Sequence, residues 1–97
     1  MERSDAKPLK AAIQQFIRAH QMQVRLDEVD VVNTWNACFG GYVERQTRSI
    51  RLKQDGKLWV KLDSGPLKEE FLMSKGEVVN RLNEELGRKL ITELVIQ

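Results

Sequence analysis

The chain has 97 residues, of which 41% are hydrophobic and 31% are charged. This length suits a single domain, and the composition excludes intrinsic disorder, which needs low hydrophobicity and a high net charge. Sixteen basic and fourteen acidic residues leave a net charge of only +2, so the total charge alone excludes neither nucleic acid nor protein as a partner.

A flexible N-terminus over residues 1–7 is predicted to precede a first helix over about residues 8–21. Pro8 suits the first turn of a helix, where its missing N–H has no intrahelical partner to lose. Apolar side chains recur at three- and four-residue spacing along this segment, which predicts one buried face. This apolar stripe comprises Leu9, Ala12, Ile13, Phe16, Ile17 and His20.

A second helix is predicted over about residues 28–39. Asp27 is a favourable N-cap, and Gly40 with Gly41 favours a C-terminus, because glycine accepts the left-handed conformation common there. Tyr42 and Val43 are expected to continue as a short turn against the same core. The predicted buried face comprises Val31, Val32, Trp35, Cys38 and Phe39.

The next segment alternates apolar and polar residues with the period of a β-strand. Asp55-Gly56 separates two such runs, which predicts a β-hairpin with a type I′ turn. One predicted face of the hairpin comprises Ile50, Leu52, Leu58, Val60 and Leu62. The opposite face comprises Arg51, Lys53, Lys57, Trp59 and Lys61.

Two further helices and a third strand are predicted after the hairpin. Ser64-Gly65-Pro66 opens one helix, and a second is expected to start at Ser74, whose spacing to Glu77 is that of a capping box. One continuous helix through Gly76 is the alternative. Gly87 is expected to end the helical region, and residues 90–96 form the third strand. We therefore predict a single α+β domain over residues 8–97, with helices on one face of a three-stranded sheet.

Residue types suited to catalysis or metal binding are scarce. The chain has one cysteine, Cys38, and one histidine, His20, and it lacks the glycine-rich phosphate-binding motifs. Cys38 is interpreted as core packing, and the pairs Glu69-Glu70 and Glu84-Glu85 as solvated helix faces. We predict no enzyme activity, cofactor, metal or small-molecule substrate. Without a signal peptide or a long apolar run, the expected location is cytoplasmic, with no membrane partner.

Positive charge is concentrated on the hairpin. Six basic residues against one acidic residue give +5 between residues 45 and 61, whereas residues 64–86 carry three against five, or −2. An exposed Trp59 among cations is typical of single-stranded nucleic-acid binding, in which a base stacks on the ring. Lysines on edge strands also prevent aggregation, and an exposed aromatic also anchors protein interfaces. All three interpretations stay open.

Several patterns together resemble the DciA family. These are Trp35-x-x-x-x-Gly40, the hairpin Gly56-Lys-Leu58-x-Val60-x-Leu62-x-Ser64, Leu82-Asn83-Glu84-x-Leu86-Gly87, and the final Ile91-x-x-Leu94-x-Ile96. The resemblance covers about residues 9–97 and implies a type II KH-like fold with one extra N-terminal helix. It further implies a role at replication initiation, in which the protein recruits and helps to load the replicative helicase and contacts DNA near the nucleoid.

The resemblance also bears on individual residues. It implies that the family-pattern positions, Trp35 among them, are core and turn residues. The Gly-x-x-Gly clamp of nucleic-acid-binding KH domains is missing, since Met73-Ser74-Lys75-Gly76 stands at that junction. The predicted contacts to single-stranded DNA or RNA are Arg45, Arg48, Arg51, Lys53, Lys57, Trp59, Lys61 and Lys75. The alternatives are a protein-only adaptor and an RNA-binding KH-like module.

Overall fold

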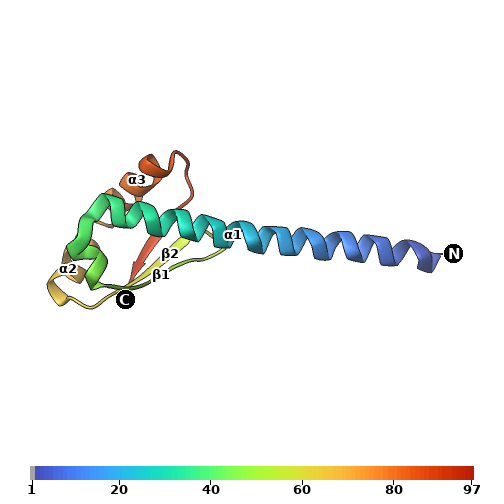
Figure 1. Ribbon diagram of the computed structural model, residues 1–97, viewed down its shortest axis with the longest axis horizontal. Helices are drawn as coiled ribbons and strands as arrows, with labels where there is room; N and C mark the ends of the chain where they lie inside the picture. Colours follow the sequence, from blue (N-terminus) through green and yellow to red (C-terminus); the bar gives the residue numbers. More distant parts are fainter. Residues whose placement is uncertain (1) are drawn as a thin grey trace.

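The computed structural model describes the backbone of residues 2–97 and the side chains of residues 8–97 (Figure 1). The elements are α1 (Glu2–Gln46), β1 (Thr47–Leu52), β2 (Lys57–Leu62), α2 (Gly65–Met73), α3 (Lys75–Leu86) and β3 (Glu93–Ile96). The predicted α+β class is confirmed, whereas the type II KH-like arrangement stays a prediction. Met1 and the side chains of residues 2–7 lie outside the described residues, and the predicted flexible terminus falls on them.

The two predicted N-terminal helices form one helix, so that part of the prediction is wrong. α1 continues from Glu2 to a kink at Gly40, and Pro8 lies inside it rather than in its first turn. Residues 21–26 contain no glycine or proline, so no residue there breaks the helix. Asp27 is therefore not an N-cap. Its buried carboxylate accepts hydrogen bonds from Gln23 Nε2 at 2.9 Å and from Arg88 Nη2 at 3.0 Å.

The predicted break at Gly40 is present as a kink within α1. Gly40 has a φ of 82°, which residues with a Cβ rarely adopt, and helical structure resumes up to Gln46. Two consecutive hydrogen bonds hold the segment after the kink in place. Trp35 Nε1 donates to Thr47 Oγ1 at 3.1 Å, and Thr47 Oγ1 donates to the Val43 carbonyl at 2.6 Å. The kink therefore turns the chain back toward the sheet.

The sheet has the order β1-β2-β3, with β1 antiparallel and β3 parallel to β2. The hairpin is confirmed, but its type I′ turn is wrong, because Gly56 has a positive φ of 87° and Asp55 does not. Gly56 N–H donates to the Lys53 carbonyl at 3.0 Å, the pattern of a type I turn followed by a left-handed glycine. A Cβ on Gly56 would lie 2.8 Å from Thr92 Cγ2, so the turn packs closely against the loop before β3.

Two separate helices, α2 and α3, meet at Ser74. Ser64 caps α2 by accepting a hydrogen bond from Leu67 N–H at 3.3 Å. The predicted capping box at Ser74 is wrong. Ser74 also ends α2, and its ψ of 23° departs from the extended conformation in which an N-cap side chain meets the next turn. Gly87 ends α3 as predicted, and β3 starts at Glu93, later than predicted.

The three helices cover one face of the sheet and share one core with it. Trp35 is fully buried, as predicted, and stacks on Phe71 with ring centroids 5.0 Å apart. Cys38 packs at the border of this core. The buried core residues are Val31, Trp35, Leu52, Leu58, Val60, Leu62, Phe71, Val78, Leu82, Ile91 and Leu94.

The N-terminal half of α1 extends away from this core (Figure 1). The predicted burial of its apolar stripe is therefore wrong, since Leu9, Ile13, Phe16 and Ile17 are exposed. No other element of the described chain lies beside them. Tyr42 is exposed as well, whereas Val43 packs against the core as predicted. Among the described residues, no helix is long and apolar enough to cross a membrane.

Candidate nucleic-acid interface

The sheet face opposite the helices, here called the open face, presents the side chains that the hairpin pattern placed there. Along β2, Leu58, Val60 and Leu62 are buried, whereas the intervening residues Lys57, Trp59 and Lys61 are exposed or half-buried. Strand alternation therefore separates the two sets, as predicted. The outward residues of the hairpin are Arg51, Lys53, Lys57, Trp59 and Lys61.

Trp59 occupies the centre of the open face. It lies directly opposite Arg51 of β1 and beside Val95 of β3. The Lys53 ammonium group lies 5.9 Å from the centroid of the Trp59 ring, within cation–π range. The indole N–H is buried and has no hydrogen-bond partner among the described residues. The ring therefore combines an aromatic surface, nearby positive charge and an unused donor.

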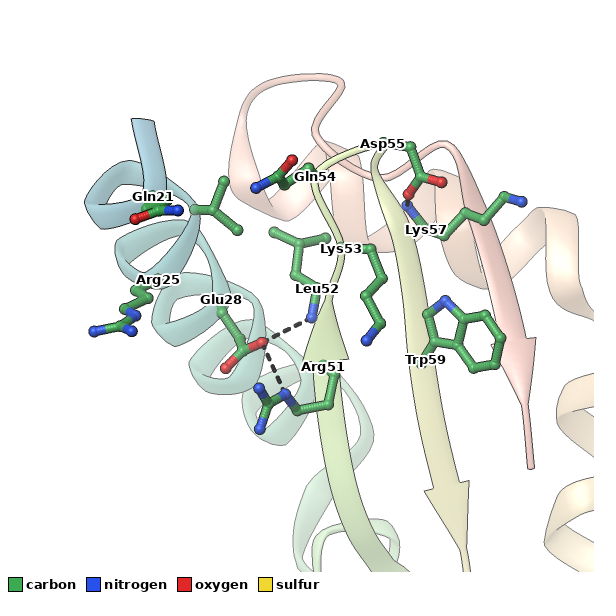
Figure 2. Close-up of a pocket in the computed structure, with 11 residues that line it drawn as sticks. Gln21, Arg25, Glu28, Arg51, Leu52, Lys53, Gln54, Asp55, Lys57 and Trp59 are labelled. Carbon is green, nitrogen blue, oxygen red and sulfur yellow. Dashed lines mark hydrogen bonds and ion pairs between the residues drawn. The ribbon is translucent and has the colours of Figure 1, made fainter. Parts of the chain in front are cut away.

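A groove of about 840 Å³ lies between α1 and the turn end of the hairpin (Figure 2). The hairpin contributes Arg51, Leu52, Lys53, Gln54, Asp55, Lys57 and Trp59 to its wall. α1 contributes Gln21, Val24, Arg25 and Glu28, which the sequence interpretation missed. Their spacing of three and four residues and the lack of a helix breaker between them were the available signals.

The groove contains four cations and two carboxylates, and each carboxylate already accepts a hydrogen bond from a backbone N–H group. Glu28 Oε2 accepts a hydrogen bond from Leu52 N–H at 2.8 Å and lies 3.6 Å from Arg51 Nε (Figure 2). Asp55 Oδ1 accepts a hydrogen bond from Lys57 N–H at 3.0 Å. Among the side chains of residues 8–97, no ion pair involves Arg25, Lys53 or Lys57. The groove therefore keeps an excess of positive charge.

Four predicted contacts lie outside this groove. Of these, Lys61 is exposed on the open face of β2. Arg48 sits at an irregularity of β1, at the end far from the turn, and pairs with Asp63 at 2.9 Å. Arg45 is in the last turn of α1. Lys75 is the first residue of α3 and belongs to the helical layer on the other face of the sheet. Any role of the eight predicted residues in binding stays a prediction.

Comparison with known proteins identifies a family but no individual relative. The family model described as "Dna[CI] antecedent, DciA" matches residues 8–96. No curated protein and no solved structure matches the chain. The family comprises helicase loaders or adaptors and is not a known enzyme family. The match spans nearly the whole chain, from the projecting half of α1 to β3, so the chain belongs to the DciA family.

Proposed function

We propose that this protein is a non-enzymatic replication factor that recruits the replicative helicase and binds single-stranded DNA on its open face. Family membership supports the helicase part of the proposal. The cluster around Trp59 supports the DNA part and is the observation on which it rests, because an aromatic ring among cations is the pattern of single-strand binding sites.

The proposed contacts divide between base and phosphate. The half-buried indole of Trp59 stacks one unpaired base, an interaction worth about 1–3 kcal/mol per base. Arg51, Lys57 and Lys61 neutralise phosphates on either side of that base. This binding mode needs no Gly-x-x-Gly clamp, so the sequence Met73-Ser74-Lys75-Gly76 between α2 and α3 does not oppose it.

Titration of fluorescent single-stranded DNA at two salt concentrations tests the DNA part. The double variant Trp59→Ala/Lys61→Glu is expected to bind roughly tenfold or more weakly than wild type and to lose part of the salt dependence. The matched control, Tyr42→Ala/Lys68→Glu, removes one exposed aromatic and reverses one charge on the helical side of the molecule. Equal, salt-insensitive binding by wild type and both variants would remove the open face from the proposal.

A protein-only adaptor is the second candidate, and the exposed apolar stripe of α1 favours it. Leu9, Ile13, Phe16 and Ile17 form a contiguous apolar surface of the kind that marks protein interfaces. Capture of the helicase by a chain without affinity for single-stranded DNA would support this candidate. A clear preference for RNA over DNA of equal sequence would instead support an RNA-binding module.

A further inference from the structure

A row of polar and basic side chains runs along one face of the projecting half of α1. The row repeats at intervals of four, four, three and four residues and comprises Lys10, Gln14, Arg18, Gln21 and Arg25. Because α1 has no break before Gly40, this spacing places all five on the same side of the helix. The sequence has no aspartate or glutamate between residues 8 and 26, so the row is uniformly positive or neutral.

The row leads directly into the groove beside the hairpin. Gln21 and Arg25 line the groove together with Arg51, Lys53 and Trp59. Figure 2 shows Gln21, Arg25 and Glu28 on successive turns of the helix, with Arg51 beside Glu28. The last cation of the row and those of the hairpin therefore line the same groove, with Glu28 beside Arg51, although they come from two elements far apart in the sequence.

We propose that the projecting half of α1 is a second phosphate-binding segment, which carries single-stranded DNA onward from the open face. This inference rests on the proposed DNA binding and adds a path to it. Residues 10–25 span about 23 Å at 1.5 Å per residue, enough for several nucleotides. The cations Lys10, Arg18 and Arg25 contact phosphates, and the glutamine amides donate hydrogen bonds between them. Such contacts do not distinguish one base from another, so binding along α1 is expected to be independent of the DNA sequence.

The apolar stripe stays accessible while the row binds DNA. At about 100° per residue, Leu9, Ile13 and Phe16 lie about 100° to 160° around the helix from the centre of the row, whereas Ile17 borders the row at about 60° from its centre. A partner protein on the stripe and a DNA strand on the row therefore occupy different sides of the same helix. Both activities of the proposed function are compatible with one extended α1.

Binding measured against the length of the DNA strand tests this path. Oligo-dT strands of about 6 to 24 nucleotides are titrated into wild type and into Lys10→Gln/Arg18→Gln, both in the full chain. Wild type is expected to bind more tightly as the DNA strand becomes longer than the segment that covers the hairpin alone. The variant is expected to bind long strands roughly tenfold more weakly at low salt. Its salt slope is expected to fall by about 1.4, since two phosphate contacts are lost at about 0.7 each.

Short strands and a charge-matched control separate the outcomes. The control Lys68→Gln/Arg81→Gln removes two basic side chains of α2 and α3, in the helical layer, and is expected to match wild type at every length. Glutamine is a good helix former, so the helical circular dichroism of the variant is expected to stay unchanged. If the variant keeps the whole gain with length, the α1 path is overturned while hairpin binding stands. If wild type binds no strand of any length, the proposed DNA binding fails with it.

Discussion

The two halves of α1 have the same apolar periodicity but opposite environments. Ile13 and Val31 are 18 residues apart, as are Ile17 and Trp35, so each pair lies on one line along the helix at about five turns' distance. Val31 and Trp35 are 0% exposed, whereas Ile13 is 51% and Ile17 is 48% exposed. Periodicity therefore defines a face of the helix, and tertiary structure decides whether anything covers it.

The largest expected difference between the two halves is in stability. Trp35→Ala removes a buried ring that packs on Phe71, and it is expected to lower the free energy of unfolding by about 3–5 kcal/mol. Ile17→Ala, on the same line of the helix, is expected to change it by no more than about 0.5 kcal/mol. Urea unfolding of both variants measures the contrast. A loss of about 2 kcal/mol or more from Ile17→Ala would mean that the projecting half is packed in solution.

A smaller difference is expected where α1 is anchored to the C-terminal loop. Arg88 binds two carboxylates of α1, Asp27 at 3.0 Å and Asp30 at 3.2 Å, but their side chains are 12% and 58% exposed. Asp27→Ala removes a buried carboxylate that accepts hydrogen bonds from both Gln23 and Arg88, and a loss of about 1–3 kcal/mol is expected.

Asp30→Ala provides the matched control, because an exposed ion pair contributes at most about 1 kcal/mol. The same urea titration measures both changes. Equal losses of unfolding free energy from the two variants would show that the buried Asp27 contributes no more than the exposed Asp30. Asp27 would then have no special part in anchoring α1 to the loop before β3.

Local signals explain which parts of the fold the sequence predicted. The hairpin, the helix start at Ser64-Gly65-Pro66 and the helix end at Gly87 each depend on a few neighbouring residues, and all three are present. The break before residue 28 was wrong because Asp27 resembles an N-cap locally. One of its two actual partners, Arg88, is 61 residues away, and such a contact leaves no local pattern.

The residues of the candidate site likewise divide into those that local patterns predicted and those that depend on contacts distant in the sequence. Strand alternation was sufficient to place Arg51, Lys57 and Trp59 on one face, because that face depends only on a period of two. The groove also needs α1 to lie along the turn end of the hairpin, which no periodicity encodes. Gln21 and Arg25 were therefore missed, although their own sequence signals a continuous helix.

The smallest expected effect is at Glu28, where the basic row meets the packed half of α1. Glu28→Gln keeps an oxygen that accepts the Leu52 N–H but removes the negative charge beside Arg51. Stability is expected to change little, whereas affinity for single-stranded DNA is expected to rise about threefold at low salt. The gain is expected to shrink as salt approaches about 1 M, where the screening length falls to about 3 Å.

The exposed Glu69 of α2 offers a charge-matched control for that measurement. Glu69→Gln changes the net charge of the protein by the same amount, but on the helical side of the sheet. An equal gain from both variants would mean that the affinity for single-stranded DNA depends only on the net charge of the protein. A gain confined to Glu28→Gln would place the strand in the groove between α1 and the hairpin, because the effect of a single charge falls off within about 10 Å at moderate salt.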